Sequence, residues 1–455
     1  MSLDQIISQY LVYYPIMFAR GQNLPRHLSD YLLSQYMSQR DIELMQLGKL
    51  QKILAYSKKN IPYYEQAHRS INLDSIRCLE DLSVFPFITK KDIKERFREF
   101  ISVRKIQRRT KKTTGGSTGQ PVTLWKTNDS VTKELAATWR AYSWAGIQIG
   151  DRQARFWGIP FSSKDRFRAK LIDFVSNRRR YGAFQYDDKS LDQYHSEIMK
   201  FKPTYFYGYV SFLAEYANFI RRNNLSRDYT LKCIISTSEL LTKYHRDLLE
   251  SVFSTKVYNE YGCGEVGSIA HECNMGSMHV MSENLIVEIY DGERRCGPDE
   301  IGEVVITELN NYAMPLIRYR IGDYAYISSK ECQCGRKLPV LGNIFGRAYD
   351  TVRNRAGKLF HGEFFMYIIE DAQKQGFCVQ SFQVIQNDLD RFTIKVVPYN
   401  GYNREIEQII VNRVKKDFDP DVSIEFKIVD EIAREPSGKM RLIVGMDTVD
   451  NNHRN

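Results

Sequence analysis

Apolar residues recur with helical spacing in the first hundred positions of the chain. One stretch has an apolar side chain at every third or fourth position, at Leu44, Leu47, Leu50 and Leu54. Residues three or four apart share one face of an α-helix, so this spacing predicts a helix with a buried face. We expect residues 1–100 to form the helical N-terminal part of a larger domain.

From about residue 105 to residue 345, short β-branched and aromatic runs alternate with stretches of helical periodicity. The predicted strands include Tyr205–Tyr209, Cys233–Ser236, Lys256–Tyr258, Leu285–Tyr290 and Glu303–Thr307. Strands that alternate with helices are typical of α/β proteins. We therefore expect a large multi-layer domain in which helices pack on β-sheets.

A shorter unit follows near the C-terminal end. Its predicted elements are strands at Ser381–Ile385 and Phe392–Val397, a helix at Asn403–Phe418 and a strand at Val422–Ile428. This order indicates a small α+β domain of about 100 residues. The predicted fold class is thus α/β, with a large domain over residues 1–349 and a small mobile domain over residues 350–455.

Length and charge narrow the class of protein. A chain of 455 residues exceeds what one hydrophobic core usually organises, which agrees with two domains. The net charge is +10, but the sequence lacks the clustered arginine and aromatic pattern of nucleic-acid-binding modules. We therefore expect no nucleic-acid partner and interpret the charge as a solvated basic surface.

The most apolar early segment is Tyr10–Phe18. It is too short to span a bilayer, contains Pro15 and lacks the basic start and cleavage site of a signal peptide. We expect a cytoplasmic protein without a transmembrane segment. A peripheral contact of this tyrosine-bearing segment with a membrane or a partner stays an open alternative.

A glycine- and hydroxyl-rich segment suits a polyphosphate. Residues 113–121 contain three glycines and four hydroxyl side chains, and they follow the basic run 108–112. Glycines let backbone amides approach an anion, and hydroxyls can bond to phosphate oxygens. The spacing is neither that of a Walker A loop nor that of a dinucleotide fingerprint. A flexible turn is the alternative interpretation.

Two downstream motifs carry groups that suit a nucleotide. Residues 257–267 indicate a strand that breaks into a glycine-rich turn with an aromatic ring, Tyr261, and a carboxylate, Glu265. A ring can stack on adenine and a carboxylate near phosphates can hold Mg²⁺, although a solvated loop glutamate is the simpler interpretation. Asp323, at the end of the run 318–323, could accept hydrogen bonds from both ribose hydroxyls.

Together these motifs resemble the adenylate-forming superfamily of acyl-CoA synthetases, peptide-synthetase adenylation domains and luciferases. Residues 113–121 resemble its signature loop, with Val122 where a lysine often stands. The valine at this position and the segments 60–64 and 85–92 are similar to the corresponding parts of the phenylacetate–CoA ligase family. The short, tyrosine-rich sequence is also similar to the capsular-polysaccharide-associated branch of that family.

The resemblance implies roles for particular residues. The family's Tyr-Gly-x-x-Glu motif matches Tyr261, Gly262 and Glu265, and it assigns the glutamate to Mg²⁺. Residues 236–239 resemble the adenine-side loop, although a helix cap explains them equally well. The residues implied in ATP or AMP binding are Thr113, Thr114, Gly115, Gly116, Ser117, Thr118, Gly119, Ser238, Glu239, Tyr261, Gly262, Asp323 and Arg347.

Two further implied roles lie towards the C-terminal end. Gly346-Arg347-Ala348-Tyr349-Asp350 resembles the Gly-Arg-x-x-Asp motif, in which the arginine faces the nucleotide and the aspartate is the hinge, here Asp350. The Pro-x-Gly-Lys motif ends on Lys439, which the resemblance assigns to the carboxylate and α-phosphate during adenylation. Lys439 and Glu265 are thus the implied catalytic residues.

Four potential zinc ligands stand in two tight pairs. His271-x-Cys273 and Cys332-x-Cys334 could give tetrahedral nitrogen and sulfur coordination. The alternative is that the pairs never meet or that the cysteines are buried thiols. Some members of the resembled branch look similar here, which favours structural zinc.

The expected reaction follows from the resemblance. It is ATP- and Mg²⁺-dependent activation of a small carboxylic acid to an acyl-AMP with pyrophosphate release, followed by transfer to CoA. One alternative acceptor is an amine, a sugar or a carrier thiol in polysaccharide or secondary-metabolite biosynthesis, and another alternative is a catalytically silent scaffold. The aromatic runs 156–160 and 205–209 could line an acyl pocket or belong to an ordinary core.

Overall fold

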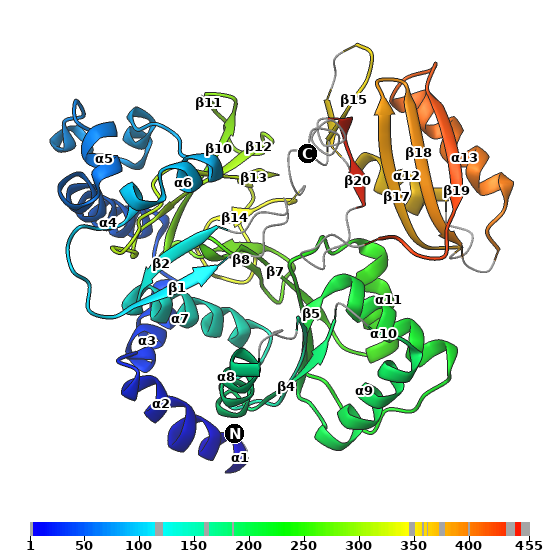
Figure 1. The fold of residues 1–455 in the computed structure, drawn as a ribbon, viewed down its shortest axis with the longest axis horizontal. Helices are drawn as coiled ribbons and strands as arrows, with labels where there is room; N and C mark the ends of the chain where they lie inside the picture. Colours follow the sequence, from blue (N-terminus) through cyan, green and yellow to red (C-terminus); the bar gives the residue numbers. More distant parts are fainter. Residues whose placement is uncertain are drawn as a thin grey trace. The chain divides into compact units, whose positions relative to one another are not determined.

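The computed structural model describes residues 3–113, 122–158, 163–183, 186–344, 351–356, 359–361, 363–372, 378–398, 401–433 and 442–446. The chain divides into two compact units (Figure 1). The first comprises Met1–Ile321 and Ala325–Asn343, and the second comprises Gly322–Tyr324 and Ile344–Asn455. The predicted boundary between residues 349 and 350 lies outside the described residues.

An eight-stranded sheet organises the first unit, in the order β14-β9-β8-β7-β6-β5-β3-β4. Its strands are β3 Gln153–Trp157, β4 Arg178–Gly182, β5 Tyr205–Tyr209, β6 Cys233–Thr237, β7 Val257–Cys263, β8 Gly267–Glu272, β9 Met278–Val280 and β14 Val340–Leu341. The five strands from β4 to β7 are parallel, and the pairs from β7 to β14 are antiparallel. The parallel half matches the predicted alternation of strands and helices.

Helices cover both faces of this sheet (Figure 1). One face packs on α7 Asn128–Trp144 and α3 Leu24–Ser34, and the other packs on α9 Asp188–Phe201, α10 Val210–Arg222 and α11 Lys243–Phe253. The alternation of side chains along a strand divides the core between the two faces. In β5, Tyr205 and Tyr207 join the α7 cluster, whereas Phe206 joins the α10 cluster.

A smaller sheet and the N-terminal helices complete the first unit. The sheet has the order β11-β10-β12-β13, with β10 Leu285–Asp291, β11 Arg294–Arg295, β12 Gly302–Glu308 and β13 Tyr319–Ala325. The early helical segments are α1 Leu3–Ile6, η1 Ile7–Tyr13, α2 Tyr14–Ala19, α4 Gln39–Asn60, α5 Pro62–Ala67, η2 Leu73–Ser75, η3 Leu79–Val84, α6 Lys90–Glu95 and η4 Phe97–Phe100. Helix α8 Ser163–Val175 links β3 to β4. Among the helices that the structure describes, none combines the length and hydropathy needed to cross a bilayer.

The buried face of α4 differs from the predicted stripe. Leu44 is 57% exposed, whereas Leu50 and Leu54 are buried together with Ile42 and Ile53. The helix therefore exists as predicted, but its core-facing side is rotated away from Leu44.

The second unit has its own four-stranded sheet, in the order β19-β18-β17-β20. Its elements are β15 Thr351–Arg353, β16 Leu359–His361, α12 Glu363–Ala372, β17 Val379–Asp388, β18 Arg391–Pro398, α13 Arg404–Asp417, β19 Ser423–Ile428 and β20 Ile443–Val444. A separate core includes Phe365, Val384, Ile394 and Val414. The predicted α/β fold class, with a small α+β unit after a large multi-layer one, is confirmed.

Candidate functional site

A β-hairpin holds the two ends of the predicted phosphate loop. Strand β1, Arg109–Thr113, pairs antiparallel with β2, Thr123–Thr127, up to the pair Thr113 and Thr123. The first predicted phosphate ligand, Thr113, is thus the last residue of β1. The others in this segment, from Thr114 to Gly119, lie outside the described residues.

A buried ion network fixes this hairpin to its surroundings. The Lys126 ammonium on β2 is 2.9 Å from the Glu134 carboxylate of α7 and also contacts the Glu308 carboxylate of β12. Burial acts to lower the pKa of Lys126, but the two carboxylates outweigh it and raise the pKa above its usual value. Lys112 on β1 adds a contact of 3.1 Å to Glu134. Both strands of the hairpin are therefore tied to one carboxylate.

The same carboxylate lies against the turn between β7 and β8. A Cβ atom added to Gly267 would stand 2.7 Å from Glu134 Oε2, and the φ angle of Gly267 is +87°. Glu134 therefore joins the hairpin to the turn that carries the predicted adenine and magnesium residues. Lys126, Glu134 and Glu308 were missed by sequence reasoning because isolated charges far apart in the chain give no local signal.

The β7–β8 turn is closely packed around the Tyr261 motif. Tyr261 is buried, and a Cβ atom on Gly262 would come within 2.5 Å of the Gly267 carbonyl oxygen. Only glycine fits at position 262 without a shift of the backbone. Glu265 is also buried, and its carboxylate is 3.6 Å from the Lys90 ammonium at the start of α6.

The α6 start therefore belongs to this site. Thr89 and Asp92 cap α6 reciprocally: the Asp92 amide donates to Thr89 Oγ1 at 3.3 Å and the Thr89 amide donates to Asp92 Oδ2 at 2.8 Å. This cap fixes the position from which Lys90 reaches Glu265. The segment 85–92, which carries the family resemblance, thus contacts the segment that carries the magnesium motif.

Glu239 caps a helix. Its carboxylate accepts hydrogen bonds from the Ser211 amide at 2.7 Å and the Ser211 hydroxyl at 2.9 Å, at the start of α10. Ser238 precedes it with a φ angle of +68°, a conformation that non-glycine residues rarely adopt. Glu239 thus contacts the start of α10, whereas Thr242 caps α11, the helix that follows residues 236–239. The adenine contact stays a prediction.

The remaining nucleotide residues are described only in part. Asp323 follows Gly322, whose φ angle is +81°, within β13. Gly322–Tyr324 belongs to the second unit, whereas the other described nucleotide residues belong to the first. The ribose role of Asp323 stays a prediction. Arg347, Asp350 and Lys439 lie outside the described residues.

Charged and aromatic groups gather on the α7 face of the sheet, beside Tyr261. Glu260, the residue before it, accepts a hydrogen bond from the Tyr142 hydroxyl at 2.9 Å and one from the Tyr207 hydroxyl at 3.4 Å. Burial raises the pKa of Glu260. The Arg155 guanidinium lies 4.8 Å from the Trp157 ring centroid and 4.5 Å from that of Tyr207. Two residues of the predicted aromatic runs therefore frame a guanidinium beside a buried carboxyl group.

Arg155 forms no ion pair within 4.0 Å among the described residues, although its charge acts on the nearby Glu260 carboxyl group. Its Nε is buried without a hydrogen bond, and no carboxylate there lies within 4.0 Å. The neighbouring Arg178 and Arg180 of β4 share Asp173. This cluster consequently holds more guanidinium groups than carboxylates that pair with them.

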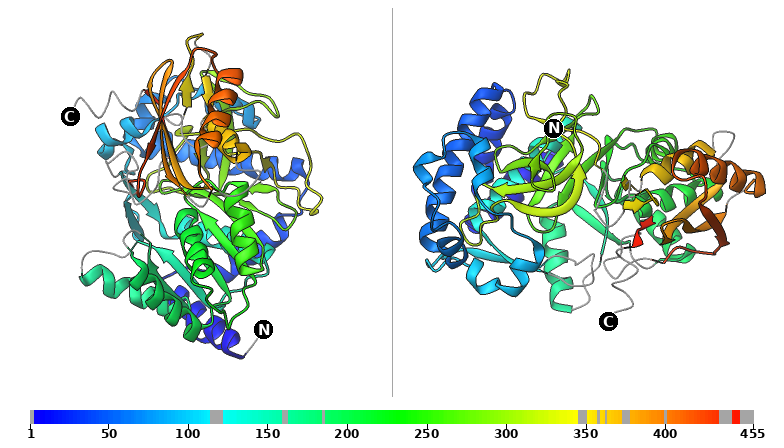
Figure 2. Two further views of the ribbon diagram at one scale, coloured as in Figure 1. Left: turned by 90° about the vertical axis from the view of Figure 1, so that its right-hand side faces the viewer. Right: turned by 90° about the horizontal axis from the view of Figure 1, so that it is seen from above.

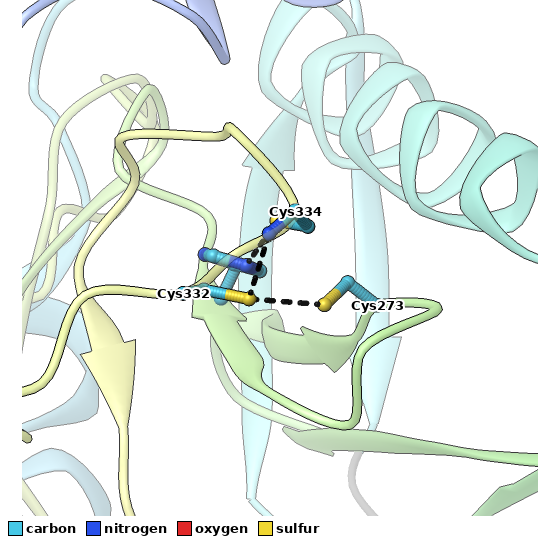
Figure 3. Close-up of side chains that lie close together, drawn as sticks. Cys273, Cys332 and Cys334 are labelled. Carbon is cyan, nitrogen blue, oxygen red and sulfur yellow. Dashed lines mark hydrogen bonds between the residues drawn. The ribbon is translucent and has the colours of Figure 1, made fainter.

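Three of the four predicted zinc ligands come together (Figure 3). The Cys273 and Cys332 sulfurs are 3.6 Å apart, and a ligand atom from each of Cys273, His279, Cys332 and Cys334 lies within 4.8 Å of the others. His279 Nε2 is 3.2 Å from the Cys334 sulfur. One thiol and one imidazole from the β8–β9 hairpin, with two thiols from the loop before β14, are a donor set that suits tetrahedral zinc.

The fourth member is His279 rather than the predicted His271. The His271 ring contacts the Ser268 hydroxyl and packs edge-on against Tyr142 at 5.9 Å. The chain reverses after Cys273, and the β8–β9 hairpin brings His279 back beside it. The ligand spacing is therefore Cys-x5-His around a turn, not the His-x-Cys that the sequence suggested.

Contacts around the cluster orient it for a metal. The Leu338 carbonyl can only accept, so His279 Nδ1 donates to it at 3.0 Å and leaves Nε2 without a proton in the neutral ring. Burial lowers the pKa of His279, which favours that neutral form. The Met275 and Cys334 amides each donate to a cysteine sulfur, Cys273 and Cys332 respectively, at 3.4 Å. These residues fit zinc.

Comparisons with known proteins agree with this architecture. The family model of the CapK C-terminal domain matches residues 354–445. Protein CapK of Staphylococcus aureus is 24% identical over 410 residues, which cover 89% of this chain and 89% of that protein. The phenylacetate-coenzyme A ligase of Thermus thermophilus is 22% identical over 387 residues, 82% of this chain and 84% of that ligase.

Solved structures show the same fold. The 2-hydroxyisobutyryl-CoA ligase in its postadenylation state, in complex with 2-HIB-AMP, superposes with a TM-score of 0.75 at 20% identity and covers 92% of each chain. The protein therefore has the fold of this acyl-CoA ligase. The chain is a homologue of Protein CapK and of the phenylacetate–coenzyme A ligases, so the predicted family resemblance is confirmed.

Proposed function

We propose that this protein is an adenylate-forming acid–thiol ligase. It uses ATP and Mg²⁺ to convert a carboxylic acid to an acyl-AMP with release of pyrophosphate, and it then passes the acyl group to CoA. The homology to phenylacetate–coenzyme A ligases supports this reaction class. The likeness to a ligase crystallised with an acyl-AMP supports the first step.

One observation carries the proposal: a single carboxylate, Glu134, contacts both the β1–β2 hairpin and the β7–β8 turn. The hairpin ends on the phosphate loop, and the turn carries Tyr261 and Glu265. Two motifs separated by more than a hundred residues are thus anchored to one another, as a site for one nucleotide requires.

The reaction needs negative charge to be neutralised on both reactants. A carboxylate oxygen of the acid attacks the α-phosphorus of ATP, the bond to the bridging oxygen breaks, and pyrophosphate leaves with that electron pair. Glu265 is the candidate ligand for Mg²⁺, which supplies charge neutralisation at the phosphates when bound. We assign to Lys439 the neutralisation of the acid carboxylate and the α-phosphate, and to Asp350 the hinge that removes Lys439 before the second step. In that step the CoA thiol, which loses its proton, attacks the acyl carbon, the bond between this carbon and the phosphate oxygen breaks, and AMP leaves.

The acid is proposed to occupy the region of Arg155, Trp157, Tyr207 and Glu260. These residues lie on or near the carboxyl ends of parallel strands, where ligands of open α/β sheets bind. Glu260 is the residue before Tyr261, so this region and the predicted nucleotide residues share the strand β7. Because the half-buried Arg155 forms no ion pair within 4.0 Å among the described residues and its Nε makes no hydrogen bond, we infer an acid that carries a second negatively charged group.

Zinc at Cys273, His279, Cys332 and Cys334 is proposed to be structural. All four tetrahedral positions would be filled by protein, which leaves none for a substrate or water. Its contribution would be to fasten the loop that carries Cys332 and Cys334 to the β8–β9 hairpin.

Pyrophosphate release from ATP tests the proposal. The full-length protein is incubated with ATP, Mg²⁺ and a panel of aryl, fatty, amino and dicarboxylic acids, each with and without CoA. We expect release with at least one acid and formation of the corresponding acyl-CoA. Glu265→Gln should lower the rate about a hundredfold or more, whereas Glu293→Gln, in the exposed turn between β10 and β11, should not.

Two further arms separate the parts of the proposal. Arg155→Met should reduce release with dicarboxylic acids more than with monocarboxylic acids; an equal effect on both would contradict the inferred second charge. Release that CoA neither stimulates nor diverts into a thioester would favour an amine, a sugar or a carrier thiol as the acceptor. Failure of every acid in a protein that binds ATP would contradict the proposed ligase function.

A further inference from the structure

Apolar side chains are exposed on two helical segments of the first unit. The exposed residues are Leu3, Ile6, Ile7, Tyr10, Leu11 and Phe18 in the N-terminal segment, and Phe167, Leu171, Ile172 and Phe174 in α8. We call these ten residues the apolar face. They make up half of the large apolar side chains that are exposed in the described part of the chain. Such a concentration differs from the scattered apolar residues of an ordinary surface.

The spacing of these residues makes continuous stripes. Phe167, Leu171 and Phe174 recur at intervals of four and three residues on α8, and they are 73%, 57% and 76% exposed. Leu3, Ile7 and Leu11 recur at intervals of four in the N-terminal segment. Each segment therefore presents a helical row of apolar side chains to solvent.

The opposite sides of the same segments hold them on the first unit. Tyr13 and Met17 are buried against α7, and Val175 joins the same core. Gln5 contacts the Asp151 side chain, so a polar residue of the N-terminal segment faces the protein while apolar ones face water. The exposed apolar side chains are therefore additional to the apolar side that attaches both segments to the core.

The two segments lie side by side. Helix α8 contacts η1, and the views in Figures 1 and 2 agree in placing α8 beside the N-terminal helices. The stripes consequently form parts of one surface rather than two isolated patches.

Charge identifies the kind of partner. Exposed Lys170 stands among Phe167, Leu171 and Phe174. The sequence of α8 also contains Lys164, Arg166 and Arg168 against Asp165 and Asp173, and Asp173 is engaged by Arg178 and Arg180. A basic helix with an exposed aromatic and leucine stripe, such as α8, suits the boundary between headgroups and acyl chains of an anionic bilayer. A second copy of a chain with net charge +10 would instead bring like charges together.

We propose that the apolar face docks this protein on the surface of an anionic lipid bilayer. The N-terminal segment and α8 lie in the interface, their apolar stripes enter the headgroup boundary, and Lys170 of α8 faces the lipid phosphates. This placement keeps the protein peripheral, since neither segment spans the bilayer.

Vesicle co-sedimentation tests the proposal with the full-length protein. We expect binding to vesicles of phosphatidylcholine with phosphatidylglycerol, weaker binding to phosphatidylcholine alone, and weakening by added salt. The triple change Phe167→Ser, Leu171→Ser and Phe174→Ser should lower the fraction bound about tenfold or more, because it removes the α8 stripe. Lys170→Glu should weaken binding to the anionic vesicles selectively.

The matched control is the triple change Leu44→Ser, Val84→Ser and Ile301→Ser, which alters exposed apolar residues outside the apolar face. It should bind vesicles like the unchanged protein, and circular dichroism should confirm that both triple variants are folded. Equal losses in both variants, or no binding to either kind of vesicle, would overturn the proposal. A second result would also overturn it: no vesicle binding, together with a dimer in light scattering that the α8 variant abolishes. A second copy of the chain would then be the partner.

Discussion

At the scale of residues, His279 determines how the metal cluster can work. Its Nδ1 hydrogen bond to the Leu338 carbonyl fixes the ring and directs the unprotonated Nε2 towards Cys334. His271 stands opposite it in the β8–β9 register, yet its ring is engaged by Ser268. Of these two histidines on paired strands, His279 is therefore positioned to bind a metal and His271 is not.

This difference gives a prediction with an internal control. His279→Ala should lower the zinc content of protein purified without chelators well below one ion per chain, because loss of one ligand weakens a four-ligand site severely. His271→Ala should retain the zinc of the unchanged protein. Elemental analysis by mass spectrometry measures both, and retention of zinc by the His279 variant would contradict the assignment.

The same residues illustrate how far sequence reasoning reaches. Cys332 and Cys334 were found from their close spacing, since neighbouring ligands leave a local signal, whereas Cys273 was found through its spacing to His271, which is not in the cluster. His279 could not be chosen over His271 because the choice depends on a hairpin that reverses the chain after Cys273. Lys126, Glu134 and Glu308 gave no signal at all, because charged residues are usually at the surface and only the packed fold brings these three together.

At the scale of elements, the β7–β8 turn shows how backbone contacts fix a site. The Gly262 backbone approaches the Gly267 carbonyl closely, while Tyr261 and Glu265 are buried on either side of that approach. A side chain at position 262 would push the two strands apart and move both residues.

Gly262→Ala should therefore destabilise the protein by about 1–3 kcal/mol, as expected for an added methyl group in a packed site. It should also lower pyrophosphate release. Gly48→Ala is the matched control, because a Cβ atom at Gly48 in α4 meets nothing within 4 Å, and it should be neutral or stabilise by up to about 1 kcal/mol. Denaturant unfolding compares the two variants, and an unperturbed Gly262→Ala protein would contradict the close packing.

Most elements could be anticipated from periodicity. The predicted strands at 205–209 and 285–290 correspond to β5 and β10, and the helix at 403–418 to α13. Strand order could not be anticipated, because pairing between β7 and β8 or between β17 and β20 depends on contacts distant in sequence. The rotated face of α4 has a similar cause: Leu44 fits the apolar period, but no partner covers it.

At the scale of the whole molecule, the two units have separate hydrophobic cores, and all four proposed zinc ligands belong to the first unit. Thermal unfolding should therefore show two transitions, since cores of different units need not melt together. A strong zinc chelator should lower the transition of the first unit only. Each kcal/mol of zinc stabilisation raises the unfolding temperature of a domain of 150–250 residues by about 2–4 °C. The first unit is larger, so its shift for each kcal/mol should be smaller. Calorimetry with and without the chelator measures this, and equal shifts of both transitions would contradict it.

The buried ammonium of Lys126 has a consequence for how this family can vary. Its removal alone would leave the buried Glu308 carboxylate without its cation and Glu134 with Lys112 as its remaining cation, and removal of either glutamate would leave the other charges unbalanced. Single substitutions at these positions are therefore disfavoured, whereas joint replacement by apolar residues can preserve the packing. Among homologues, the three positions should be inherited as a set, so their co-variation would record an ion network that no short motif reveals.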